Sequence, residues 1–188
     1  MRRLVFVLLA LLLAAPAFAE TPEEEATHYL QTMVASVREK NDPMRNRMFI
    51  KLRVLGEASV DPLLAGLADE TPDVRRYLAF TLGFFDVPRV TDPLLALFRS
   101  DREVSVRTAA AEALGRLQRP EAVDPLVAAL ADANASIRQS AAYSLGLIGD
   151  PRARPALERA KSDTDELVRF FAEEALVEIE REEARKKR

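Results

Sequence analysis

The sequence repeats itself with a period of about thirty residues, and this period limits the chain to very few folds. A shared arginine recurs at spacings of 32, 31 and 31 residues, at Arg75, Arg107, Arg138 and Arg169. A proline recurs in phase with it at spacings of 31, 32 and 30, at Pro62, Pro93, Pro125 and Pro155. Two markers that keep one period are typical of a repeat protein, in which each short unit buries its apolar side only by stacking on the next.

Each unit predicts two short helices. The first begins at an Asp-Pro-Leu sequence such as Asp61-Pro62-Leu63, because proline suits the first helical turn and aspartate is a good cap before it. The second carries apolar residues at helical spacing and begins near Val74, Val106, Ile137 or Val168. Leu-Gly near its end, at Gly83, Gly115 and Gly146, indicates close packing of the next helix rather than a C-cap.

This pattern resembles the HEAT repeat family, particularly its short bacterial subtype related to bilin-lyase subunits. The strongest local match runs from Val106-Arg107 to Leu114-Gly115-Arg116-Leu117, and the resemblance covers about residues 57–180. It implies an all-α fold, a right-handed α-α superhelix (a HEAT-type solenoid) of about four helix pairs with an N-terminal capping helix pair.

The resemblance also implies a structural ladder of aspartates and arginines. HEAT repeats share an aspartate in the turn between the two helices and an arginine early in the second helix. Each aspartate here precedes its arginine by six residues. We expect charge-assisted hydrogen bonds along the stack and no catalytic role for these residues. The ladder residues are Asp69, Arg75, Asp101, Arg107, Asp132, Arg138, Asp163 and Arg169.

The N-terminal residues 1–19 have the pattern of a signal peptide. Arg2 and Arg3 precede the apolar run Leu4–Ala15, and Ala17-Phe18-Ala19 forms a small-residue cleavage site. A helix of that apolar run would span about 18 Å, less than the roughly 30 Å of a bilayer core. We therefore expect a periplasmic or secreted protein without stable membrane insertion after cleavage, and an uncleaved anchor is the alternative. Residues 20–56 are the predicted capping helices, 57–180 the repeats and 181–188 a charged tail.

Composition removes several kinds of chemistry. The chain has no cysteine and a single histidine, His28, so we expect no disulfide, no metal site and no cofactor. Without Arg2 and Arg3 the 27 basic residues become 25 against 30 acidic ones, a net charge of −5, which argues against a nucleic-acid partner. The sequence also lacks a phosphate-binding loop and a nucleophile elbow. These absences lead to the expectation that the chain is not an enzyme.

One face of the second helices is the predicted partner-binding surface. Residues one, five and nine positions after each ladder arginine should project outward together. Aromatic and charged residues mix in that row, as protein-binding patches require. The proposed contacts are Phe80, Phe84, Glu112, Arg116, Tyr143, Leu147 and Phe170. A register error, or cover from a terminal helix over Phe80 and Phe84, is the alternative explanation.

The sequence features favour one of three possible functions. The leading hypothesis is an exported scaffold or adaptor that binds a protein or peptide without catalysis, with its oligomeric state open. The alternative is an accessory subunit related to the bilin-lyase HEAT proteins, although an export signal does not suit their cytoplasmic setting. A metalloenzyme of the deoxyhypusine hydroxylase kind is disfavoured, because its di-iron site needs several His-Glu pairs and this chain has one histidine.

Cleavage after Ala19 gives the first testable prediction. The protein recovered from an envelope fraction should begin at Glu20, because the small residues Ala17 and Ala19 fit a signal-peptidase site. Intact-mass spectrometry measures this directly. Recovery of the full-length chain, anchored in the membrane fraction, would contradict it.

Overall fold

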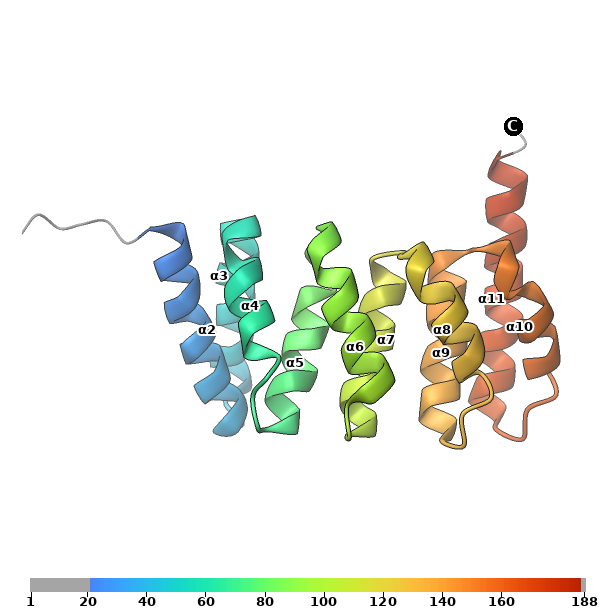
Figure 1. The fold of residues 1–188 in the computed structure, drawn as a ribbon, viewed down its shortest axis with the longest axis horizontal. Helices are drawn as coiled ribbons and strands as arrows, with labels where there is room; N and C mark the ends of the chain where they lie inside the picture. The colour runs from blue at the N-terminus through green and yellow to red at the C-terminus, as the bar shows by residue number, and fades with distance from the viewer. Residues whose placement is uncertain (1–20, 187–188) are drawn as a thin grey trace, which may run out of the picture.

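The computed structural model describes residues 21–186, so the predicted signal peptide lies outside the described residues. The described chain forms a row of helix pairs that stand side by side along the long axis of the molecule (Figure 1). No strand occurs between residues 21 and 186. This arrangement confirms the predicted all-α solenoid.

The pairs divide into two layers. A capping pair comes first, α2 (Pro22–Arg38) and α3 (Asp42–Leu55). The first helices of the four following pairs are α4 (Val60–Gly66), α6 (Thr91–Ser100), α8 (Val123–Ala129) and α10 (Arg154–Ala160). The second helices are α5 (Pro72–Leu82), α7 (Val104–Arg116), α9 (Ala135–Ile148) and α11 (Glu166–Lys186).

The second helices form the continuous layer, because α5 packs on α7, α7 on α9 and α9 on α11. Each first helix packs mainly on the second helix of its own pair. Fully buried leucines fill the space between the layers in every unit, among them Leu63, Leu82, Leu94, Leu114, Leu126, Leu145 and Leu157. The core therefore runs the length of the row without interruption.

The N-terminal end of the row is closed by α2. The Thr21 hydroxyl accepts the Glu24 backbone N–H at 3.2 Å, and the Glu24 carboxylate accepts the Thr21 N–H at 2.8 Å. This capping box satisfies two N–H groups that a helix end otherwise leaves free. Helix α2 then buries Ala26, Met33 and Val37 against the capping partner and the first repeat.

The sequence analysis misplaced the start of the first helices. A short 3-10 turn precedes each of them, namely Gly56–Ser59, Pro88–Val90, Pro120–Ala122 and Pro151–Ala153. Asp61 is consequently the second residue of α4 and not its cap. In the last unit the capping residue lies before the 3-10 turn and not at the start of the helix. There Asp150 accepts the Arg152 backbone N–H at 2.9 Å.

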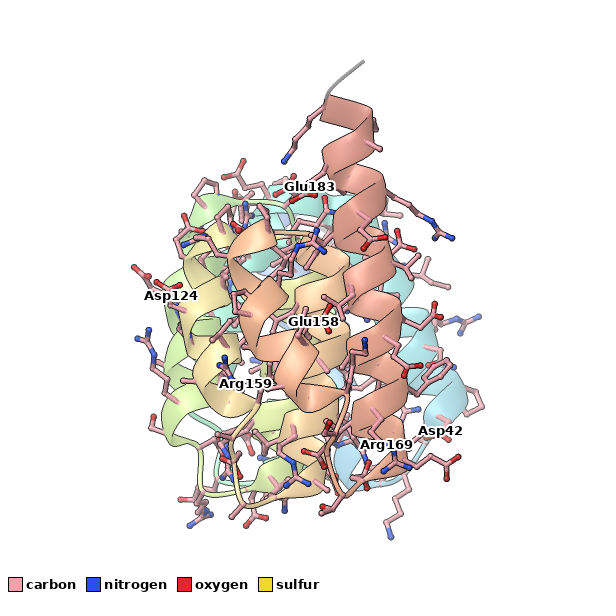
Figure 2. The ribbon with its side chains drawn as sticks, turned by 90° about the vertical axis from the view of Figure 1, so that its right-hand side faces the viewer. Asp42, Asp124, Glu158, Arg159, Arg169 and Glu183 are labelled. Carbon is pink, nitrogen blue, oxygen red and sulfur yellow. The ribbon has the colours of Figure 1, made fainter. Side chains whose placement is uncertain are left out.

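At the other end, α11 is longer than its neighbours and projects beyond them. Figure 2 looks at this end of the row, where α10 carries Glu158 and Arg159 and α11 rises past it toward Glu183. Arg154 of α10 contacts Glu180 and Glu183 of α11 at 3.5 and 3.1 Å. Helix α11 continues through Lys186, so it includes most of the predicted charged tail, residues 181–188.

Glycines near the ends of the second helices let neighbouring helices approach closely. A Cβ added at Gly115 would lie 2.7 Å from Ser144 Cα of α9, and one at Gly83 would lie 2.9 Å from Ala113 Cα of α7. The Ser144 hydroxyl also donates to the Ala111 carbonyl at 2.9 Å, joining α9 to α7. This confirms the prediction that the glycines serve helix packing.

A Gly115→Ala substitution should therefore destabilise the protein by about 1–3 kcal/mol, despite alanine's better helix propensity, because the new methyl meets backbone. Gly66→Ala is the matched control. Its Cβ would meet only Leu78 Cδ1, the movable end of a side chain. Urea unfolding measures both, and equal stability of the two variants would contradict the packing argument.

Candidate functional site

Three adjoining cavities run across the second helices and form one groove, called here the second-helix groove. The cavity between α5 and α7 measures about 360 Å³, the one between α7 and α9 about 400 Å³, and the one between α9 and α11 about 250 Å³. Thr108 and Glu112 line the first two, and Tyr143 and Phe171 line the last two. The groove thus crosses three helix boundaries without a break.

Glu112 lies at the middle of this groove. Its side chain is half-buried between two cavities and has no hydrogen-bond or ion-pair partner among residues 21–186. Burial raises the pKa of the Glu112 carboxyl, and the positive charge of Arg116 opposes that rise. A carboxyl group in this setting can hold a proton and donate it to a ligand in the groove.

The half of the groove nearest the N-terminus is aromatic. Phe80 of α5 and Phe84, in the turn just after α5, have ring centroids 5.1 Å apart, and Phe49 of α3 lies 6.0 and 5.2 Å from them. These pairs are tilted or edge-to-face, which suits the charge distribution of the rings. Helix α3 of the capping pair therefore partly covers Phe80 and Phe84, as the alternative explanation of these residues supposed.

The half nearest the C-terminus exposes its rings more fully. Tyr143 of α9 is 41% exposed and Phe170 of α11 is 52% exposed. Phe171 joins them, with ring centroids 5.6 Å from Tyr143 and 5.5 Å from Phe170. The cavity beside these rings is lined mainly by apolar atoms of Tyr143, Leu147 and both phenylalanines.

All seven residues predicted as partner contacts lie on this face, and none is fully buried. The structure brings Phe80, Phe84 and Arg116 together at one end, and Tyr143, Leu147 and Phe170 at the other, with Glu112 between them. The predicted surface does not include Phe49, Phe171 or Arg53, which the structure adds to it. Phe49 follows the buried Met48, and an aromatic residue next to the apolar side of a capping helix was the signal available in the sequence.

The ladder runs along the stack as the resemblance implied, and its side-chain pairs join each arginine to the aspartate of the following unit rather than to the one six residues earlier. Arg75 donates from Nε and Nη2 to both carboxylate oxygens of Asp101, at 2.7 and 3.0 Å, and Arg138 does the same to Asp163 at 2.8 Å. Each carboxylate therefore belongs to the following unit. The aspartate six residues earlier provides its backbone carbonyl instead, as Asp69 does for Arg75 at 2.9 Å.

One joint of the ladder lacks this side-chain bond. Arg107 donates to the Asp101 carbonyl at 2.7 Å but to no described carboxylate. Asp132 of the following unit accepts the Asn134 backbone N–H at 2.7 Å, as the other ladder aspartates accept the equivalent N–H, but it accepts no bond from Arg107. Arg38 and Asp69 extend the ladder to the capping pair with a contact of 2.7 Å.

The intact joints hold aspartates in their charged form. Hydrogen bonding to Arg75 lowers the pKa of the Asp101 carboxyl against the opposing effect of burial, and Arg138 lowers the pKa of Asp163 in the same way. A carboxyl whose pKa is lower in the folded state stabilises the fold above its unfolded pKa, near 4, and loses that contribution as the pH falls through the folded value.

Two other features of the described chain bear on chemistry. Within residues 21–186 no three histidine, cysteine, aspartate or glutamate side chains gather as a metal site would require. Among the same residues no helix combines the length and the apolar character needed to cross a membrane. Neither finding tests the sequence-based expectations about cofactors or location.

A row of helix pairs with one continuous groove on its second helices defines an α-solenoid of the HEAT and armadillo class. A profile of HEAT repeats matches residues 60–146 and 123–187. The chain therefore belongs to the HEAT repeat family, as its Asp–Arg ladder and repeat period predicted.

Two curated relatives are similar over about half of the chain. Phycocyanobilin lyase subunit beta of Thermosynechococcus vestitus is 33% identical over 102 residues, 54% of this chain and 48% of that protein. Deoxyhypusine hydroxylase of Gallus gallus is 35% identical over 106 residues, 55% of this chain and 35% of that protein. The chain thus spans less than half the length of each relative.

Solved structures show the same relationship. A chain in the complex of CpcE and CpcF of phycocyanin lyase from Nostoc sp. PCC7120 is 27% identical with a TM-score of 0.70, over 78% of this chain and 97% of that one. A designed armadillo repeat protein in complex with a (KR)4 peptide, 20% identical with a TM-score of 0.53, covers 71% of this chain and 69% of its own and shares the fold. The resemblance to bilin-lyase-related HEAT proteins is confirmed.

These relatives contradict the expectation that the chain is not an enzyme. They are a lyase subunit and a hydroxylase, so membership of this group does not exclude catalysis. The expectation failed because it relied on local motifs. In a solenoid, groups from helices about thirty residues apart meet in one groove, as Glu112 and Tyr143 do, and no short motif records that meeting.

The ladder yields a prediction with an internal control. Arg75→Met should cost about 3 kcal/mol or more, because it leaves the buried Asp101 carboxylate without its partner. Arg107→Met removes an arginine at the equivalent position without breaking a carboxylate pair, so its cost should be smaller. Urea unfolding at pH 7 compares them, and equal losses would contradict the assignment.

The same variants differ in pH dependence. Wild-type stability should fall as the pH drops below about 4, because the unfolded chain then binds protons that Asp101 and Asp163 do not bind in the folded state, where their pKa values are lowered. Arg75→Met should reduce that fall, because it removes the largest cause of the lowered pKa of Asp101. Arg107→Met should leave the fall unchanged, and this is the control.

Proposed function

We propose that this chain is a subunit of a lyase-class enzyme that works together with a second polypeptide, bound through the second-helix groove. The observation that supports this most is the similarity to one chain of the two-chain CpcE–CpcF complex, which extends over 97% of that chain. The relationship to a phycocyanobilin lyase subunit points in the same direction.

The groove has the physical properties of a polypeptide-binding surface. Tyr143 and Phe170 provide large, partly exposed rings that lose water on contact, which is the usual source of binding energy at interfaces. Gln139 and Glu112 provide polar groups between the aromatic ends. Because the three cavities lie in a line, an extended segment suits the groove better than a compact ligand.

Glu112 is the residue we propose as the proton donor in this groove. Lyase reactions make or break a bond to carbon with movement of a proton, and a general acid near the reacting atoms speeds such a step. A carboxyl group with a raised pKa keeps its proton closer to neutral pH and can deliver it. The absence of an internal partner leaves Glu112 free to contact the substrate.

We also propose that the protein acts in the bacterial envelope. This rests on the signal-peptide pattern of residues 1–19 and on the predicted cleavage after Ala19. The substrate of a lyase located there need not be the one named in the relatives. Phycocyanobilin and phycocyanin are therefore used below to test for a lyase-class reaction, and they are not proposed as the natural substrates.

The proposal is tested on the complex isolated from the native host. The tagged chain should elute with a second polypeptide, and light scattering should give a mass larger than that of the chain alone. Tyr143→Ser combined with Phe170→Ser should release that polypeptide, because both ring anchors are lost. Ile50→Ser with Val54→Ser is the matched control, since it removes two exposed apolar side chains of α3 that line none of the three cavities.

Glu112→Gln separates binding from chemistry. This variant should keep the second polypeptide but lower the rate of the reaction of the complex with phycocyanobilin and phycocyanin by about 100-fold or more, because glutamine has no acidic proton to donate. A variant as active as wild type would remove Glu112 from the reaction. A chain that elutes alone, or a complex that survives the loss of both rings, would contradict the binding role of the groove.

A further inference from the structure

Two arginines from different helices stack on one aromatic ring beside the cavity between α5 and α7, which Phe80 of the same cluster lines. The guanidinium carbon of Arg116, from α7, lies 4.5 Å from the centroid of Phe84, and that of Arg53, from α3, lies 5.3 Å from the same centroid. Arg116 is also 5.2 Å from Phe80, and Arg53 is 5.9 Å from Phe49. Three helices thus converge on one cationic and aromatic cluster.

Neither arginine has an acidic partner in the part of the chain that the structure describes. The ion pairs within 4.0 Å in residues 21–186 include neither Arg53 nor Arg116. Nearby arginines of the same face are paired, Arg45 with Asp42 and Arg76 with Asp73. Arg53 and Arg116 therefore lack a carboxylate partner, although neighbouring arginines of the same face have one.

The most available partner is present but not used. Glu112 stands four residues before Arg116, the spacing at which helix side chains of opposite charge usually meet. The Arg116 guanidinium instead lies across Phe80 and Phe84, and it forms no ion pair with Glu112 within 4.0 Å. The carboxyl of Glu112 and the guanidinium of Arg116 are therefore not joined to each other.

The position of Arg116 is also fixed by burial. Its Nη1 is buried and has no hydrogen-bond acceptor, and a Cβ added at Gly83 would lie only 2.8 Å from it. A buried donor without an acceptor costs free energy, so the guanidinium is held by packing and not by a salt bridge. Such a fixed plane loses little side-chain entropy when an anion binds to its remaining N–H groups.

We infer that Arg53 and Arg116, together with the rings of Phe49, Phe80 and Phe84, form a carboxylate-binding site. A guanidinium binds a carboxylate through parallel N–H···O bonds, and its planar shape stacks on rings without losing those donors. The rings would contact an apolar body next to the acid group. Two sources have this chemistry, an acidic side chain of a polypeptide and a small organic acid.

This site goes beyond the proposed function, since it concerns charge recognition at one end of the groove. It does not require that the chain is a lyase subunit. Glu112→Gln tests the proposed catalysis and Arg116→Gln tests carboxylate binding, so either proposal can fail while the other holds.

The test uses the arginine side-chain N–H resonances of residues 20–188, observed by nitrogen-15 NMR. Benzoate represents a small organic acid, and the peptide acetyl-Leu-Glu-Phe-Glu-Leu-amide represents an acidic segment. We expect saturable shifts of the Arg53 and Arg116 Nε–H signals. Tighter binding of the peptide, by about tenfold or more, assigns the site to a polypeptide, and the reverse order assigns it to small acids.

Neutral analogues and variants decide whether the carboxylate is recognised. Benzamide and the same peptide with glutamine in place of glutamate should bind at least about tenfold more weakly. Arg116→Gln should abolish saturation at Arg53, whereas Arg159→Gln, an exposed arginine of α10 (Figure 2), should change nothing. Arg116→Lys keeps the charge without the planar fork and should weaken binding less than Arg116→Gln.

Two outcomes would overturn the site. One is equal binding of the acids and their neutral analogues. The other is a uniform shift of exposed arginines, Arg159 included, without saturation at Arg53 and Arg116. Unchanged thermal unfolding of Arg116→Gln, followed by circular dichroism, shows that lost binding does not come from lost folding.

Discussion

A helix pair of this size cannot bury its own apolar stripe, and everything else in the structure depends on that limit. The pairs are stable only when the second helices pack on one another, from α5 through to α11. Close packing needs small residues at the contacts, which Gly115 beside Ser144 and Gly83 beside Ala113 provide. The capping pair and the long α11 close the two ends of a row that would otherwise expose its core (Figure 1).

The same stacking creates the surface on which we propose that a partner binds. Helices that meet closely through their small residues leave shallow spaces between larger side chains on the outer face, and these spaces join into the second-helix groove. The groove has a cationic aromatic end around Arg116, a carboxyl at its middle and an exposed aromatic end around Tyr143 and Phe170. This polarity gives an extended partner a preferred direction, because its acidic and apolar groups match opposite ends.

The Asp–Arg ladder illustrates how a residue pattern and its pairing differ. Sequence spacing identified Arg75 and its six-residue neighbour Asp69, but Arg75 binds the side chain of Asp101 and only the backbone carbonyl of Asp69. A guanidinium has several donors in a fixed fork, so it can join its own turn and the next unit at once. The repeat period predicts the same residues in every unit, so it could not predict that the bond between Arg107 and Asp132 is missing.

The sequence by itself determined the repeat unit, the helical layers and the face that carries the proposed binding residues, because each follows from spacing along one helix. It could not determine which charges stay unpaired, that Phe49 would cover Phe80, or that Glu112 would stand alone in a cavity. Those properties depend on contacts between helices about thirty residues apart, and the distances there are set by packing of the whole row. Tertiary structure alone therefore decided where a proton donor and an anion site can exist on this solenoid.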